Sequence, residues 1–134
     1  MRKIYLCVLF TLFSLSLSAY KDPVSGVEYE TNSDGTAKVA SDNLGKNLKT
    51  PNIVILSSFS VGGKDYIVTE ISASAFGANL YSLTHGGDYY ITSVQIPETV
   101  TKIGSEALAY LYNLTSINLP SNLTKIERQC FFQL

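Results

Sequence analysis

Histidine and cysteine are scarce in this 134-residue sequence, which contains one histidine and two cysteines. A metal site needs several ligands at defined spacing, and no such set surrounds His85 in the sequence. One isolated histidine does not build a catalytic triad or a Cys-His pair either. We therefore interpret His85 as a solvated loop residue, and we predict a protein that is not an enzyme and that carries no metal or cofactor.

Long apolar runs are also lacking after the N-terminal segment. Two basic residues there precede an uncharged, largely apolar stretch over residues 4–17, and small residues follow it. This layout is typical of a secretory signal peptide, whereas a membrane-spanning helix needs about 20 apolar residues. We predict a signal peptide over residues 1–19, cleaved near Ser18 or Ala19, a secreted or cell-surface location, and no membrane insertion after cleavage.

Charged residues make up 16% of the sequence, below the roughly 25% of typical domains. Removal of Arg2 and Lys3 with the signal peptide leaves eight of the ten basic residues against eleven acidic ones, a formal net charge of −3. No basic cluster follows residue 3. Proteins that bind nucleic acids or anionic membranes present basic patches. We therefore predict no nucleic-acid partner.

An internal repeat organises the second half of the chain. Residues 91–104 and 114–127 align without a gap at an offset of 23 residues, with identical Thr-Ser, Pro and Thr-Lys-Ile positions. Residues 68–76 match residues 100–108 at an offset of 32, because extra residues lie in between. Self-similarity at a fixed period predicts a repeat architecture. We place about two and a half units in residues 67–134.

Each unit alternates apolar and polar residues as a half-buried strand does. Gln95 lies between Val94 and Ile96, Asn118 lies between two apolar residues, and a proline that ends the strand follows in each case. A second short extended run comes next, and we predict a short helical turn after it. One unit cannot bury its apolar side, whereas stacked units bury it continuously. The predicted fold is therefore a mostly β repeat solenoid.

These units resemble the BspA-like leucine-rich repeat family, whose pattern is roughly L-T-S-I-x-I-P-x-x-V-T-x-I-G-x-x-A-F. Residues 114–126 fit this pattern closely, while Leu108 replaces the usual Phe and Glu127 the usual Gly. The resemblance implies a leucine-rich-repeat stack of ~23-residue units. It also implies a surface or secreted protein, often of a host-associated microbe, that adheres to host proteins or to other cells.

Cleavage of the signal peptide removes Cys7 and leaves Cys130 as the one remaining cysteine, so no internal disulfide forms. In the repeat alignment Cys130 takes the small position that Ala75 and Ala107 hold. A buried free cysteine behaves as a small hydrophobic residue. We therefore predict a structural rather than a nucleophilic role for Cys130.

Residues 20–66 precede the repeats and have the turn signals of β-hairpins. A first hairpin is predicted to turn at Asp34 and Gly35, because this dipeptide tolerates positive φ. A second candidate hairpin pairs residues 52–60 with residues 64–70. The first coil of a solenoid needs a cover. We therefore predict that this segment is an N-terminal β-hairpin cap.

The exposed strand positions form the candidate ligand face, because repeat solenoids vary these positions while the core stays fixed. The candidate residues are Ser93, Gln95, Ser116 and Asn118. We predict that a protein partner, from a host or from a cell surface, binds here. The alternative is a structural spacer or capping module of a larger surface protein, with no ligand of its own.

The insertion at residues 77–90 is a second candidate. It contains Tyr81, Tyr89 and Tyr90 among Ser, Gly and Asn residues. Tyrosines in such loops are common at recognition surfaces. The simpler interpretation is a surface bulge that packs back on the solenoid, since insertions in surface loops cost little free energy.

Two N-glycosylation patterns begin at Asn113 and Asn122. Their threonines, Thr115 and Thr124, are themselves repeat positions, so each pattern requires only an Asn at a variable place. The patterns have a meaning only if the source is eukaryotic.

The sequence ends at Leu134, early in a further unit and without a terminal cap. An uncovered coil exposes apolar side chains and an unpaired strand edge, which readily recruits another chain. We therefore expect either a piece of a longer protein or self-association through the C-terminal coil.

Overall fold

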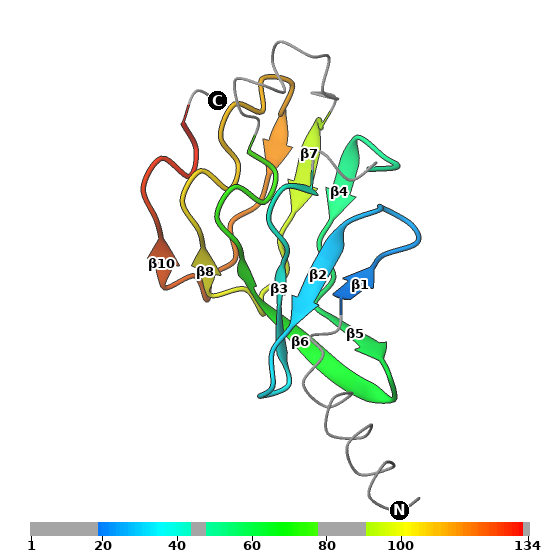
Figure 1. The fold of residues 1–134 in the computed structure, drawn as a ribbon. Helices are drawn as coiled ribbons and strands as arrows, with labels where there is room; N and C mark the ends of the chain where they lie inside the picture. The colour runs from blue at the N-terminus through cyan, green and yellow to red at the C-terminus, as the bar shows by residue number, and fades with distance from the viewer. Residues whose placement is uncertain (1–18, 44–47, 78–90, 133–134) are drawn as a thin grey trace, which may run out of the picture.

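The computed structural model describes residues 19–43, 48–77 and 91–132, and strands dominate these ranges (Figure 1). Parallel strands of successive repeat units lie side by side, and antiparallel strands occupy one end of the stack. No helix in the described ranges is long and apolar enough to cross a membrane. The strands are β1 (Ala19–Lys21), β2 (Glu28–Thr31), β3 (Thr36–Val39), β4 (Asn52–Val54), β5 (Ser58–Val61), β6 (Lys64–Ile71), β7 (Ser93–Gln95), β8 (Lys102–Ile103), β9 (Ser116–Ile117) and β10 (Lys125–Ile126).

Sheet A has seven strands in the order β1-β2-β3-β6-β8-β10, with β5 added beside β6. Its strands β3, β6, β8 and β10 run parallel. Glu70 pairs with Lys102, and Lys102 pairs with Lys125. These partners are 32 and 23 residues apart in the sequence, which are the offsets of the repeat alignment. The predicted register of the repeat stack is therefore confirmed.

Sheet B is the second parallel sheet, in the order β4-β7-β9. Ile53 pairs with Val94, and Val94 pairs with Ile117. Val94 and Ile117 are again 23 residues apart. Each repeat unit thus contributes one short strand to sheet B and one to sheet A, and the chain coils between the two sheets.

The predicted hairpin over residues 52–60 and 64–70 is wrong in its first half. Residues 58–61 do pair with β6 in antiparallel fashion, but β4 lies in sheet B and pairs with β7. The reason is that residues 52–54 occupy the place of a repeat strand, and the β5–β6 hairpin is an excursion from that coil. The parallel pairing of sheet B therefore begins with β4, before residue 67.

A third column of turns follows the strands of sheet A. Asp42, Ser74, Glu106 and Gln129 occupy equivalent places and have φ between 55° and 58°. Backbone hydrogen bonds join successive turns, as where the Ser74 N–H donates to the Ser105 carbonyl over 2.9 Å. Residues of a right-handed α- or 3-10-helix have negative φ. The predicted short helical turn is therefore wrong, because a left-handed residue bends the chain back at this point in every coil.

The apolar repeat positions fill the space between the two sheets. Ile71 and Ile103 are fully buried, and so are Ala75 and Ala107. Cys130 is buried at the equivalent place in the last coil. The buried position that the alignment assigned to Cys130 is confirmed, since its side chain is enclosed like those of Ala75 and Ala107.

The N-terminal end of the stack is covered as predicted. Strands β2 and β3 form an antiparallel hairpin with Gly35 at φ 85°, and β1 adds to β2. Four aromatic rings pack behind these strands, namely Tyr20, Tyr29, Phe59 and Tyr66, and the first and third stack at 4.4 Å. The Leu56 N–H donates to the Tyr29 hydroxyl over 3.0 Å. This cluster replaces the repeat core at the end of the solenoid.

Candidate binding face

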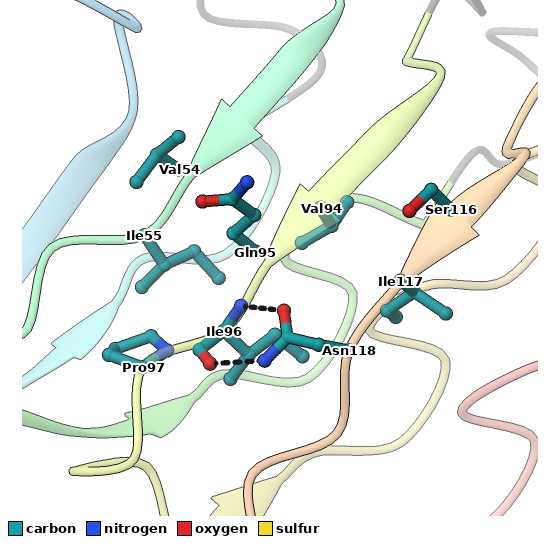
Figure 2. Close-up of a pocket in the computed structure, with 9 residues that line it drawn as sticks. All are labelled: Val54, Ile55, Val94, Gln95, Ile96, Pro97, Ser116, Ile117 and Asn118. Carbon is teal, nitrogen blue, oxygen red and sulfur yellow. Dashed lines mark hydrogen bonds between the residues drawn. The ribbon is translucent and has the colours of Figure 1, made fainter.

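The outer surface of sheet B is hollowed across its three strands (Figure 2). The hollow has a volume of about 420 Å³. Of the described residues, aliphatic side chains, two amides, one hydroxyl and one proline line it, and no charged or aromatic side chain among them does. The lining residues are Val54, Ile55, Val94, Gln95, Ile96, Pro97, Ser116, Ile117 and Asn118.

Three of the four residues of the predicted ligand face meet at this hollow, namely Gln95, Ser116 and Asn118. Ser93 does not line it. The Ser93 hydroxyl donates to Oδ1 of Asn52 over 2.8 Å, at the other end of the sheet B strands. The predicted recognition loop with Tyr81, Tyr89 and Tyr90 lies outside the described residues, as does His85.

The Asn118 amide is bound to the neighbouring coil rather than directed to solvent. Its Nδ2 donates to the Ile96 carbonyl over 2.7 Å, and its Oδ1 accepts from the Ile96 N–H over 2.8 Å. The amide thereby pairs with both polar groups of one residue, as a neighbouring strand would. Asn118 thus has a structural function that its exposed position in the sequence pattern does not reveal.

The Gln95 amide is different, although Gln95 is the equivalent residue one coil earlier. The Ile55 N–H donates to the Gln95 backbone carbonyl over 3.0 Å. The Ile55 N–H is thus bound to the backbone of Gln95 and is not available to the Gln95 side-chain amide. The exposed Gln95 amide lies beside Val54 over the hollow (Figure 2). It has both a donor and an acceptor to offer to a ligand.

Val54 is a wall of the hollow that sequence reasoning missed. Its side chain is 49% exposed at the end of β4. An alignment of residues 52–55 with residues 93–96, at an offset of 41, would have identified Val54 as a strand position of the repeat. The alternation of Ile53 and Ile55 supports this alignment. The β5–β6 hairpin and the insertion at 77–90 make this spacing irregular and hide the repeat.

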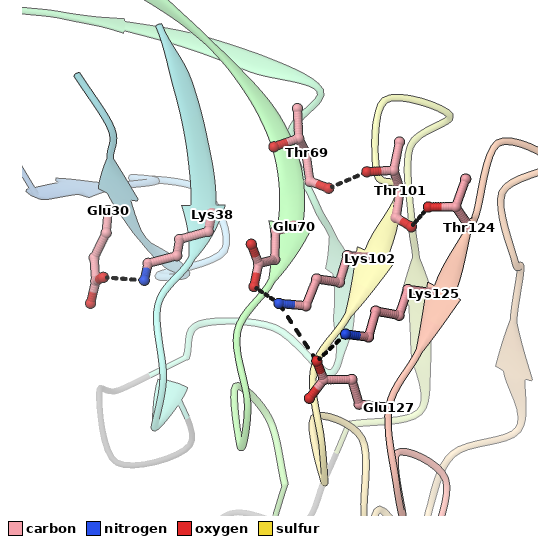
Figure 3. A network of polar contacts seen from close by, with 9 residues as sticks. All are labelled: Glu30, Lys38, Thr69, Glu70, Thr101, Lys102, Thr124, Lys125 and Glu127. Carbon is pink, nitrogen blue, oxygen red and sulfur yellow. Dashed lines mark hydrogen bonds and ion pairs between the residues drawn. The ribbon is translucent and has the colours of Figure 1, made fainter. Parts of the chain in front are cut away.

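Threonine side chains set the distance between coils. The Thr115 hydroxyl donates to the Thr92 carbonyl over 3.1 Å, and the Thr124 hydroxyl donates to the Thr101 carbonyl over 3.0 Å (Figure 3). Thr101 reaches Thr69 in the same way. These contacts explain why the Thr-Ser and Thr-Lys-Ile positions repeat identically. Both polar residues of the second glycosylation pattern are therefore engaged within the solenoid. The Thr124 hydroxyl is bound to Thr101, and the Asn122 side chain donates to the Glu98 carbonyl.

Charged side chains form a network on sheet A (Figure 3). Lys102 lies 3.1 Å from Glu70 and 3.6 Å from Glu127, and Glu127 lies 3.4 Å from Lys125. The hydrogen bond and charge of Glu70 raise the pKa of Lys102, while the hydrogen bond from Lys125 lowers the pKa of Glu127. Both shifts favour the charged forms. The network therefore cross-links coils and does not resemble a proton-transfer pair.

Within residues 19–43, 48–77 and 91–132, no group of three or more His, Cys, Asp or Glu side chains is placed to hold a metal ion. Burial raises the pKa of the Cys130 thiol to about 11. The thiol is therefore protonated near neutral pH, and the thiolate is the nucleophilic form of cysteine.

Stacked coils with one strand in each of two parallel sheets define a leucine-rich repeat solenoid. Residues 69–134 match the family described as BspA type leucine rich repeat region. The chain belongs through this segment to the BspA-type leucine-rich repeat family. No curated protein has significant sequence similarity to the chain.

Solved structures of bacterial proteins have the same fold. A leucine rich cell surface protein from Faecalibacterium prausnitzii A2-165 is 31% identical over 87% of this chain, with a TM-score of 0.64. Leucine-rich repeat proteins from Bacteroides capillosus ATCC 29799 and Bacteroides ovatus ATCC 8483 are 27% and 25% identical over 83% and 78% of the chain, with TM-scores of 0.66 and 0.58. The chain spans 28%, 72% and 24% of these three proteins in turn.

Proposed function

We propose that the chain is a secreted or cell-surface leucine-rich-repeat module that binds a protein partner through the outer face of sheet B. The observation that carries this proposal is the hollow across β4, β7 and β9, where exposed apolar surface lies beside the Gln95 amide. Apolar concavities with a few polar groups are the usual form of a binding site. The similarity to a bacterial cell surface protein supports the location.

Export is part of this proposal, and it rests on the layout of residues 1–19, most of which lie outside the described residues. Expression of the full chain in a bacterium with a secretory pathway, followed by N-terminal sequencing of the exported protein, tests it. We expect the mature chain to begin at Ala19 or Tyr20. An exported protein that still begins at Met1 would contradict the proposal.

A matched pair of variants tests the binding face. Val54→Lys places a charge in the hollow, and Ile67→Lys places one on the β5–β6 hairpin of sheet A. The two side chains are 49% and 51% exposed, so the substitutions disturb the core to a similar degree. Beads coated with residues 20–134 are offered a panel of purified extracellular proteins. We expect Val54→Lys to abolish adhesion to the bound protein and Ile67→Lys to leave it unchanged.

The second candidate function is a structural spacer or capping module. The aromatic cluster and the antiparallel strands that cover one end of the solenoid favour it, because a terminal unit of a repeat stack needs such a cover. In that case the panel yields no protein whose adhesion depends on Val54. This outcome would exclude the sheet B face as a binding site and would leave the spacer role.

A further inference from the structure

The hydrogen bonds around the hollow on sheet B narrow the chemistry of its ligand. The Asn118 amide is fully engaged by the backbone of Ile96. The Ser116 N–H donates to the Thr92 carbonyl, and the Gln95 carbonyl accepts from Ile55. The side-chain amide of Gln95 and the hydroxyl of Ser116 have no such partner within the part of the chain that the structure describes. A ligand in the hollow therefore meets one donor-acceptor amide, one hydroxyl and aliphatic surface.

The protein itself contains a template for what such an amide binds. The Asn118 amide donates to the carbonyl and accepts from the N–H of the same residue, with lengths of 2.7 and 2.8 Å. A residue in an extended chain offers this pair of partners, because its own N–H and C=O point to the same side of the strand. Gln95 stands at the equivalent place one coil earlier and has one more methylene. The N–H of Ile55, which corresponds to Ile96, already donates to the backbone carbonyl of Gln95 and is not bound to its side-chain amide.

We propose that the hollow takes an extended, uncharged peptide segment of the partner protein, with its backbone paired to the Gln95 amide and an aliphatic side chain packed between Val54 and Ile117. This inference rests on the proposed function and specifies the ligand. Main-chain pairing at a sheet, combined with a pocket for a side chain, is an established mode of peptide recognition. In this protein the side-chain amide of Gln95 would form the hydrogen bonds that the backbone of an edge strand forms in that mode.

The uncharged lining selects against other ligands. A charged group in the hollow would lose solvation without a counter-charge, which is unfavourable. Nucleic acids require cations that neutralise phosphates, and no described lysine or arginine lines the hollow. Among the described residues, a sugar ring would find no aromatic face in the lining to stack on. An aliphatic peptide segment matches both the apolar wall and the neutral amide.

The test uses capped heptapeptides on an array, with residues 20–134 as the soluble probe. We expect the bound peptides to share Val, Ile or Leu between uncharged neighbours. Methylation of the paired backbone nitrogen should weaken binding about 3- to 10-fold, as should Gln95→Ala, because each removes one neutral hydrogen bond. Ser93→Ala, a change on the same strand outside the hollow, should leave the affinity unchanged.

The outcomes separate this inference from the proposed function. Bound peptides rich in charged residues, or affinity independent of Gln95 and of N-methylation, would overturn the peptide assignment. If adhesion to an extracellular protein still fails in Val54→Lys while no peptide binds, the face binds a folded surface and only the peptide assignment is wrong. Adhesion that is unchanged in both Val54→Lys and Gln95→Ala would contradict the inference and the proposed function together.

Discussion

Asn118 shows how one side chain completes a sheet that the backbone leaves unfinished. Strand β9 ends at Ile117, yet the side-chain amide of Asn118 continues the pairing by two hydrogen bonds to the backbone of Ile96. Loss of partners from part-buried backbone groups is costly, since a net hydrogen bond contributes about 0.5–1.5 kcal/mol. The exposed position of Asn118 allows water to replace some of the lost contacts.

We therefore expect Asn118→Ala to lower the free energy of unfolding by about 1–2 kcal/mol. The matched control is Gln95→Ala, which removes an amide without internal partners and should change stability by less than about 0.5 kcal/mol. Urea unfolding followed by circular dichroism measures both. Equal effects of the two substitutions would mean that the Asn118 pairing contributes nothing to the fold.

Cys130 and Tyr29 make the stability of the protein sensitive to alkali. Burial raises the pKa of the Cys130 thiol from 9.0 to about 11 and also raises the pKa of the Tyr29 hydroxyl above its ordinary value. Groups with a raised folded pKa bind protons more tightly in the native state, so stability is intact below the unfolded pKa and falls as pH rises toward the folded pKa.

We expect unfolding free energy to decrease between about pH 9 and 11, with Cys130 contributing on the order of 2–3 kcal/mol. Cys130→Ala, which restores the residue found at Ala75 and Ala107, should flatten this part of the profile. Native protein at pH 8 should also react with iodoacetamide far more slowly than urea-unfolded protein. A thiol that alkylates at the same rate in both states would contradict the burial.

The sequence pattern predicts which residues face outward, but it does not predict what an outward residue binds. Gln95 and Asn118 are equivalent in the repeat, and the alternation predicts the ligand face for both. Whether an amide bonds to the adjacent coil depends on the length of its side chain and on whether the backbone of that coil is already paired. Those features depend on register and spacing between coils.

At the level of the structural element, the turn after each sheet A strand determines how closely coils approach. Gly104 packs against the backbone of Ala73, and an added Cβ would overlap it. Ser72 is the equivalent residue of the preceding coil and is buried without a partner for its hydroxyl. One repeat position therefore has two different environments in adjacent coils.

These environments predict that a substitution to alanine has opposite effects on stability at the two positions. Gly104→Ala should destabilise the protein by about 1–3 kcal/mol through overpacking. Ser72→Ala should be neutral or stabilising, because it removes a buried hydroxyl that has no hydrogen bond. Thermal unfolding of the two variants beside the parent protein measures the difference. A Gly104→Ala variant as stable as the parent would show that the coils separate at little cost.

The repeat elements with regular spacing were predictable from sequence, and those interrupted by excursions were not. Strands β8 and β10 follow the 23-residue offset and were placed in register. The sequence of strand β4 predicts a hairpin strand, because its apolar alternation suits a hairpin strand as well as a repeat strand. The left-handed residues of the turns, such as Ser74 and Glu106, were missed because their side chains do not mark this conformation.

At the scale of the whole molecule, the two ends of the described solenoid differ. The N-terminal end is covered by β1 and β2 and by the stacked rings of Tyr20 and Phe59. In the last described coil, Leu119 and Ile126 are 51% and 46% exposed, although their equivalents Ile96 and Ile103 are buried. Ile96 and Ile103 are buried because the next coil of the stack covers them.

We therefore expect a protein comprising residues 20–134 to self-associate or to have a low melting temperature. Each coil of a solenoid gains much of its stability from its neighbour, and an unpaired strand edge such as that of β10 recruits another chain. Addition of two consensus repeat units and a polar terminal cap should cover Leu119 and Ile126. The extended protein should melt at a higher temperature and remain monomeric by light scattering at the same concentration.

A control separates the apolar surface from the strand edge. Leu119→Gln with Ile126→Gln removes the exposed apolar side chains but keeps the edge of β10 free, so it should reduce self-association and should not raise the melting temperature. The extended protein should do both, because it adds strand pairing and core contacts together. If residues 20–134 are monomeric and melt no lower than the extended protein, the last coil stabilises itself without a neighbour. The exposed side chains would then have no part in assembly.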